Sequence, residues 1–376
     1  MKTHHLSAKL DEPFAFSQNW ISSRSTTVIE IVSDEGTVGY GESYGPPEAI
    51  CPTIDRLLKP VILKADPCDV EVLWEKMYNT LRDSGQKGIA VASISGIDIA
   101  LWDLIGKELN KPIHKLIGGS FRDKVMAYAT GLYQKRKDDP VKDLVDEATT
   151  YVQQGFKAMK MKIGFGPDRD LKNVKAVREA IGSNVLLMVD ANHAYDARTA
   201  IRLGRNIEKY DIYWFEEPVP PEDVEGYAEV KSKIGIPISG GECEFTRFGF
   251  RNLITQRVLD IAQPDTCAAG GITECKKIAS MANSCGIHFI PHVWGGPIAI
   301  AASLHLIASL PDYPPSLNPI SAMLEFDRTP NPIREELARQ PFSQIDGYVQ
   351  VPKGAGLGIT IDEEALRRYC VTCARS

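Results

Sequence analysis

The chain has 376 residues, of which 43% are hydrophobic and 24% charged, so it can bury a large core and form two domains. Its net charge of −6 gives no reason to expect nucleic-acid binding. No run of 18 apolar residues predicts a membrane span, and the first residues lack the apolar core of a signal peptide. The eight cysteines are scattered, which is typical of a reduced, cytoplasmic protein.

The first 122 residues predict strands followed by helices. Two β-rich stretches, near 5–10 and at 26–43, bracket a loop at 13–25, and the Asp-Glu-Gly turn in the second stretch is a hairpin signal. Helical patterns follow, the last of them at 88–109. Strands followed by helices are typical of an α+β domain that is separate from the rest of the chain.

From residue 124 onward, apolar strands alternate with helical patterns. The strand ends lie 23 to 28 residues apart, which leaves room for one strand, one helix and two short loops. These ends are Lys162, Asp190, Glu216, Glu242, Asp265 and His292. An eighth strand near Ala322 to Phe326 leads into a Pro-rich segment instead of a helix of normal length.

This alternation predicts an α/β fold, a (β/α)7β modified TIM barrel, in which the strand ends build the active site. We expect residues 1–122 to form an α+β capping domain and residues 123–328 to form the barrel. Residues 329–376 are expected to return to the capping domain.

Three carboxylates end three consecutive predicted strands. Asp190, Glu216 and Glu242 occupy the same phase of the repeat. Glu217 has the opposite parity and is expected to support the ligands from behind, the alternative being that Glu217 is the ligand in place of Glu216. Carboxylates so close together repel one another unless a cation lies between them, and hard oxygen ligands favour Mg²⁺, with Mn²⁺ as an alternative. The competing interpretation is three solvated loop residues, as most acidic residues are.

Lys160 and Lys162 share one face of their predicted strand, and apolar side chains occupy the other face. Both amines should therefore point into the barrel mouth, where the carboxylates supply the counter-charges that buried ammonium groups need. Close like charges predict a lowered pKa for the lysines, which would make one of them a usable base. Alternatively, both lysines lie on an exposed edge strand and extend their ammonium groups into solvent.

Asp265 and His292 end adjacent predicted strands. A carboxylate beside an imidazole fixes its tautomer and raises its basicity, so the pair is a candidate base, although a purely structural pair is the alternative. Glu325, at the end of the eighth strand, is expected to hydrogen-bond a substrate carboxylate or another site residue, unless it is solvated. His193 follows the first carboxylate strand and contacts either a substrate or a backbone carbonyl.

These residues resemble the mandelate racemase subgroup of the enolase superfamily over nearly the whole chain. The matching phrases, in chain order, are KMKIGFG, VDANH, WFEEP, GGE, QPD and PHVWG. The resemblance implies that a carboxylate substrate chelates Mg²⁺ and loses the proton next to its carboxylate. Lys162 would approach one face of the substrate, and His292 with Asp265 the other, while Lys160 would stabilise the developing charge.

The resemblance also implies the substrate class, a small acid sugar or its lactone. We expect the elimination to open an aldaric acid lactone to a 3-deoxy-2-keto diacid. Loss of hydroxide would instead make the protein an acid-sugar dehydratase, and return of the proton on the opposite face a racemase or epimerase. Trp20, Arg24 and Tyr44 in the N-terminal loops, with Asn192 and His193, are candidate substrate contacts. We expect a homo-oligomer without nucleic-acid or membrane partners.

Overall fold

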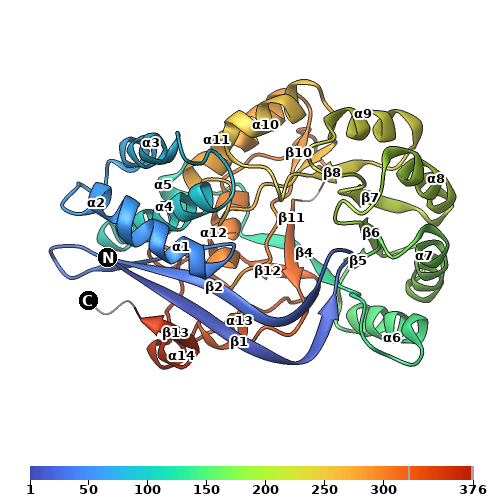
Figure 1. The fold of residues 1–376 in the computed structure, drawn as a ribbon, viewed down its shortest axis with the longest axis horizontal. Coiled ribbons are helices and arrows are strands. Elements are labelled where there is room, and N and C mark those ends of the chain that lie inside the picture. The colour runs from blue at the N-terminus through green and yellow to red at the C-terminus, as the bar shows by residue number, and fades with distance from the viewer. Residues whose placement is uncertain (321, 374–376) are drawn as a thin grey trace.

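The computed structural model describes residues 1–320 and 322–373. Figure 1 shows a ring of strands with helices around it and a smaller unit at one side. The strands of the larger unit run parallel in the order β10-β9-β8-β7-β6-β5-β4-β11, and β12 adds to β4 in the antiparallel direction. Their bounds are β4 Lys124–Gly131, β5 Ala158–Lys162, β6 Leu186–Asp190, β7 Ile212–Glu216, β8 Ile238–Gly240, β9 Ile261–Ala262, β10 His288–Phe289, β11 Met323–Asp327 and β12 Tyr348–Gln350.

As the alternation predicts, a helix lies between each pair of consecutive strands from β4 to β11. These helices are α6 Pro140–Gln153, α7 Pro167–Ile181, α8 Ala197–Ile207 with the 3-10 turn η2 Glu208–Tyr210, α9 Val224–Lys233, α10 Thr246–Thr255, α11 Gly271–Ser284 and α12 Pro297–Ala308. Several begin at an aspartate whose carboxylate accepts a backbone N–H of the first turn, as Asp139 does for α6 and Asp196 for α8. β11 is followed by the five-residue α13 (Pro332–Glu336), which confirms the (β/α)7β pattern.

The barrel interior is filled by large side chains below its carboxyl-terminal mouth. Tyr128, Met188, Trp214 and Ile290 are buried and belong to one apolar cluster contributed by different strands. Because side chains alternate along a strand, the residue two positions further on faces the same interior one level higher. On β5, Ala158 belongs to the same cluster, and Lys160, two positions further on, is 0% exposed.

The smaller unit packs a four-stranded antiparallel sheet, in the order β13-β1-β2-β3, against helices. Its elements are β1 Lys2–Ala15, β2 Trp20–Val32, β3 Val38–Ser43, α1 Pro47–Thr53, the π-helical turn η1 Ile54–Leu58, α2 Lys59–Ile62, α3 Val70–Leu81, α4 Ile89–Glu108, α5 Ile113–Leu116, α14 Glu363–Tyr369 and β13 Cys370–Cys373. β13 pairs with β1, so the C-terminal segment contributes to the capping sheet (Figure 1, red beside blue).

The N-terminal loop is shorter than predicted. Residues 13–15 and 20–25 are strand rather than loop, because β1 and β2 resume pairing after a register shift, with Phe14 opposite Ile21. The hairpin therefore reaches as far as the barrel mouth. At its tip, Ser17 Oγ donates a hydrogen bond to the carbonyl of Ala191, 2.7 Å away, directly after β6.

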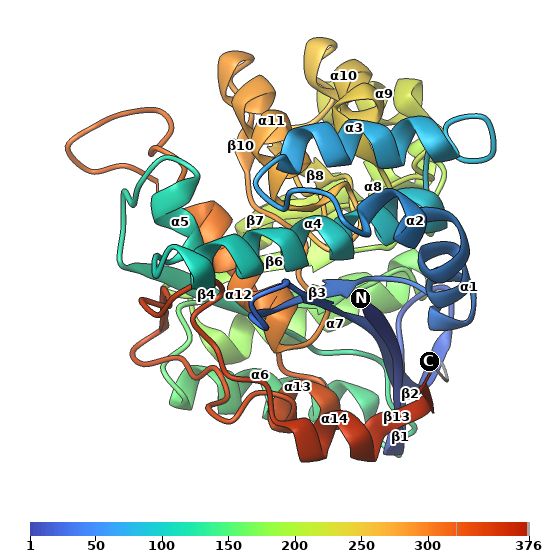
Figure 2. The same ribbon diagram turned by 90° about the vertical axis from the view of Figure 1, so that its left-hand side faces the viewer.

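Among the described residues, α4 alone is long and apolar enough to cross a membrane, and 83% of its most apolar window is buried inside the protein. It is the core helix of the capping unit and packs on β3 and α11 (Figure 2). Its contact with β3 is very close, because a Cβ added to Gly41 would lie 1.9 Å from the carbonyl oxygen of Gly96.

Candidate active site

The three predicted carboxylates meet at the barrel mouth. Asp190 ends β6, Glu216 ends β7 beside it, and Glu242 follows β8 by two residues. One oxygen from each lies within 4.8 Å of the others. Burial raises the pKa of Glu216 to about 8, and the charges of Asp190 and Glu242 add to this rise while Lys160 opposes it.

The donor set fits a hard divalent cation. Glu242 Oε2 is buried and has no hydrogen-bond partner in the described part of the chain, so this oxygen can bind a cation. Lys160 contacts Glu216 and Glu325, Lys162 contacts Asp190, and Glu242 lies near the imidazole of His292, which is itself paired with Asp265. When all four carboxylates are ionised, their charge exceeds that of the two ammonium groups by two, and a divalent cation would neutralise this excess.

Both lysines point into this cluster, as predicted from the strand alternation. Lys160 Nζ lies 2.5 Å from Glu216 Oε1 and 2.9 Å from Glu325 Oε1, and the Lys162 ammonium donates to Asp190 Oδ2. The predicted lowering of the lysine pKa is wrong for this arrangement. Burial lowers the pKa of Lys162, but the adjacent Asp190 carboxylate outweighs both burial and Lys160, so the pKa rises above its usual value.

Asp265 and His292 form the predicted pair. Asp265 Oδ2 lies 2.6 Å from His292 Nδ1, and both residues are at most 5% exposed. Nε2, the other ring nitrogen, faces the carboxylate cluster, 3.4 Å from Glu242 Oε2. Burial lowers the pKa of His292, but the charges of Glu242 and Glu325 and the hydrogen bond to Asp265 together raise it to about 10.

Glu325 is buried and connects the two sides of the site. Its Oε1 accepts a 2.6 Å hydrogen bond from Thr130 Oγ1 and contacts Lys160, and its Oε2 accepts from the backbone N–H of Val293, next to His292. The interpretation of Glu325 as a solvated loop acid is therefore wrong. The lysine attracts the carboxylate strongly enough, against the effect of burial, to lower its pKa to about 2.

Sequence reasoning missed two partners of Glu216. Its Oε2 accepts hydrogen bonds from Gln263 Nε2 at 2.8 Å and from Trp214 Nε1 at 3.0 Å. These bonds fix the carboxylate from the side opposite to Lys160. The signal was available, because Gln263 precedes Asp265 by two residues and Trp214 precedes Glu216 by two, and residues two apart share a face.

The residues beyond β6 take two different positions. The Asn192 amide Nδ2 lies 3.4 Å from Glu242 Oε1, at the edge of the carboxylate cluster. His193 Nδ1 instead lies 3.0 Å from Glu217 Oε2. Glu217 is buried behind the ligands, as its parity predicted, and burial together with the charge of Glu242 raises its pKa to about 7.

The N-terminal candidates differ in how they meet the site. The Tyr44 ring lies 5.5 Å from the His292 ring, centroid to centroid. Arg24 is 4% exposed, and its guanidinium lies 3.2 Å from Asp327 and donates to Thr329 and to the Trp294 carbonyl. Trp20 is 36% exposed and lies under Arg136. Of these three residues, Tyr44 thus lies against the candidate base His292, whereas Arg24 makes contacts within the protein.

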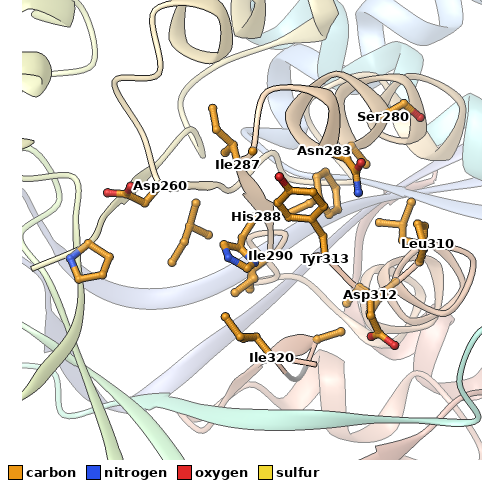
Figure 3. Close-up of a pocket in the computed structure, with 18 of the residues that line it drawn as sticks. Asp260, Ser280, Asn283, Ile287, His288, Ile290, Leu310, Asp312, Tyr313 and Ile320 are labelled. Atoms are coloured by element: carbon orange, nitrogen blue, oxygen red, sulfur yellow. The ribbon is translucent and has the colours of Figure 1, made fainter. Parts of the chain in front are cut away.

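Two cavities differ in their relation to these residues. One of about 280 Å³ lies against the site and is lined by Arg24, Tyr44, Glu42 and Trp294. A larger one, of about 530 Å³, includes His288 and Tyr313, whose rings lie 5.9 Å apart (Figure 3). His288 begins β10 and His292 follows its end, so the larger cavity lies at the opposite end of the barrel. His288 is half-buried and lines this cavity.

Comparisons with known proteins show the family of the chain. Residues 1–118 match the mandelate racemase / muconate lactonizing enzyme N-terminal domain, and residues 143–365 match the enolase C-terminal domain-like family. The chain is 42% identical to D-galactarolactone cycloisomerase of Agrobacterium fabrum, covering 98% of this chain and 97% of that protein. It is 40% identical to arabinonate dehydratase of Saccharolobus solfataricus, covering 90% and 89%.

Solved structures share the fold along the whole chain. The 3,6-anhydro-D-galactonate cycloisomerase of Zobellia galactanivorans is 43% identical, with a TM-score of 0.89 over 99% of this chain and 98% of that one. A racemase of Streptomyces coelicolor with bound magnesium is 29% identical, with a TM-score of 0.88 over 98% and 99%. The expected resemblance to the mandelate racemase subgroup is confirmed. The chain belongs to the mandelate racemase/muconate lactonizing enzyme family of the enolase superfamily.

Proposed function

We propose that this protein removes the proton next to the carboxylate of an aldaric acid lactone and opens the lactone ring by β-elimination. The observation that carries the proposal is the placement of two candidate bases around one carboxylate cluster. Lys162 is on β5 and His292 follows β10, and the carboxylate-bearing strands β6, β7 and β8 lie between them in the sheet. A substrate held at the cluster would therefore have a base on each side.

In this proposal Asp190, Glu216 and Glu242 hold Mg²⁺, with Mn²⁺ as an alternative, and the magnesium-bound racemase of the same fold supports it. When bound, the ion would act as a Lewis acid toward the substrate carboxylate and neutralise Asp190, which lowers the pKa of Lys162 toward the working range. Gln263 and Trp214 keep one oxygen of Glu216 occupied and so orient the carboxylate.

The proton and the leaving group then move as follows. Lys162 or His292 takes the proton from the carbon next to the carboxylate, and the electron pair delocalises into that carboxylate as an enediolate. Lys160 is held beside this charge by Glu216 and Glu325 and stabilises it. The electron pair of the enediolate then expels the ring oxygen from the β-carbon, and this oxygen leaves as part of a free carboxylate. The resulting enol takes up a proton and becomes the 3-deoxy-2-keto-hexarate, so the reaction is an isomerisation that consumes no water.

The second candidate is an acid-sugar dehydratase. The 40% identity to arabinonate dehydratase favours it, because that relative covers nearly the same residues. The first step is the same, but hydroxide leaves from the β-carbon and His292, protonated on Nε2, would donate a proton to it. A racemase or epimerase of the same family would return the proton to the carbon without elimination.

One experiment separates these reactions. The protein is incubated with Mg²⁺ in deuterated water with galactaro- and glucarolactones, open-chain aldonates and aldarates, and 3,6-anhydro sugar acids, and the products are followed by NMR. Opening of the lactones supports the proposal. Reaction of the open-chain acids alone favours the dehydratase, and deuterium at the carbon next to the carboxylate without elimination favours the epimerase. Turnover of the anhydro acids alone would indicate that the substrate is a cyclic ether and not a lactone.

We further propose a cytoplasmic homo-oligomer that binds a small acid sugar or its lactone. Free thiols support the reducing compartment; they are Cys51, Cys68, Cys243, Cys267, Cys275 and Cys285. The division into residues 1–122, 123–328 and 329–376 stays a prediction, in which residues 374–376 lie outside the part that the structure describes.

A further inference from the structure

A second set of metal-ligating side chains lies immediately beyond the three carboxylates. His193 follows Asp190 by three residues, Glu217 follows Glu216 by one, and Cys243 follows Glu242 by one. One ligand atom of His193, Glu217 and Cys243 lies within 4.8 Å of each of the other two. The same three strand ends thus present an inner set of oxygen donors and an outer set of nitrogen, oxygen and sulfur donors.

The backbone explains how two sets arise from neighbouring residues. His193 has φ of 53° and Glu217 has φ of 43°, both in the left-handed region that non-glycine residues seldom occupy. A left-handed residue breaks the alternation of side chains between the two faces of a strand. The side chains of His193 and Glu217 therefore do not share the face that carries Asp190 and Glu216. Such conformations persist only when the surrounding structure imposes them, and they concentrate at ligand sites.

The Glu217 carboxylate has unused capacity to bind a cation. Glu217 is 1% exposed, and its Oε1 is buried without a hydrogen-bond partner among the described residues. Its other oxygen lies 3.0 Å from His193 Nδ1. Two ligands at about 2.0–2.2 Å from a tetrahedral zinc ion are roughly 3.3–3.6 Å apart, so a small side-chain shift would bring this pair to the required separation.

We propose that His193, Glu217 and Cys243 bind a borderline-soft divalent cation such as Zn²⁺, next to the site proposed for Mg²⁺. Imidazole and thiolate ligands select Zn²⁺ or Co²⁺ over Mg²⁺, whereas the inner oxygen set has the opposite preference. The Cys243 thiol loses its proton to solvent when the metal–sulfur bond forms. The His193 side chain is 26% exposed, which gives the ion access and leaves a fourth position for water.

The test uses the full-length protein saturated with Mg²⁺, so that the inner site is occupied. Zn²⁺ binding is measured by equilibrium dialysis for the wild type, Cys243→Ser and the matched control Cys68→Ser, which changes an exposed cysteine. We expect one Zn²⁺ per chain in the wild type and the control, and an affinity weaker by about tenfold or more in Cys243→Ser. Equal affinity in all three proteins would overturn the proposal.

Co²⁺, added to the Mg²⁺-saturated protein, provides a second readout. A cobalt ion bound by Cys243 gives a thiolate-to-metal charge-transfer band in the near ultraviolet, and the Cys68→Ser protein should keep this band. Bound Co²⁺ without the band would show that sulfur is not a ligand and would reject the assignment. Neither readout measures turnover, so failure here leaves the proposed elimination untouched, and failure of the elimination leaves this site standing.

Discussion

The junction between the capping unit and the barrel predicts an unusual pH dependence of stability. Asp98, on α4, is fully buried, and its Oδ2 accepts a 3.1 Å hydrogen bond from the backbone N–H of Thr273 in the first turn of α11. Its Oδ1 has no hydrogen-bond partner in the described structure. Burial outweighs the hydrogen bonds from Thr273 and raises the pKa of Asp98 from 3.8 to about 7.

The sign and size of the effect follow from that shift. Between the two pKa values the unfolded chain loses the proton of Asp98 while the folded protein keeps it, so stability falls as the pH rises. A difference of about three pKa units corresponds to roughly 4 kcal/mol at most. Asp98→Asn cannot ionise and lacks this loss. From about pH 4 to about pH 8 the variant should therefore gain up to that amount relative to the wild type.

Urea unfolding followed by tryptophan fluorescence measures this gain at a series of pH values. Trp74 and Trp102 hydrogen-bond to Gly270 and Thr273 at the start of α11, so they report on this junction. The matched control is Asp34→Asn, which makes the same charge change at an exposed turn. If the free energies of unfolding of Asp98→Asn and the wild type differ by the same amount at every pH, the carboxylate is ionised in the folded protein and the reasoning is refuted.

Three further outcomes are expected. Lys162→Ala and His292→Asn should each keep the far-ultraviolet circular dichroism and lower kcat by about 10²–10⁴-fold; normal turnover in both would remove the base assignments. Chelation by EDTA should abolish activity and added Mg²⁺ should restore it, whereas activity that survives exhaustive chelation would argue against a metal-assisted reaction. Arg24→Ala should destabilise the protein by about 3–5 kcal/mol in urea unfolding, because it breaks a buried contact with Asp327. Unchanged stability with a raised KM would instead place Arg24 in substrate binding.

The positions of the strand-end residues were predictable because the βα repeat imposes a regular spacing. Once Asp190 and Glu216 fall at the same phase of successive parallel strands, the sheet must bring them together. The Asp265–His292 pair follows from the same rule, and the short helix after β11 follows from its Pro-rich sequence. These features depend on local patterns that repeat along the chain.

The features that could not be predicted depend on distances across the fold. The sequence shows that Lys160 and Lys162 are close, but not that Asp190 lies against the Lys162 amine, and this contact reverses the direction of the pKa shift. The extent of the N-terminal hairpin is also non-local. Phe14 pairs only after a register shift in β1, and the packing beneath the strand decides where pairing resumes.

The most direct test of the account is a calorimetric titration of Mg²⁺ into the metal-free protein and into Glu216→Gln. The account predicts one Mg²⁺ per chain in the wild type, and affinity reduced by about tenfold or more in the variant, whose side chain keeps its size but loses its charge. Identical binding by both proteins would mean that the ends of β6, β7 and β8 do not form the magnesium site, and the proposed chemistry would lose its foundation.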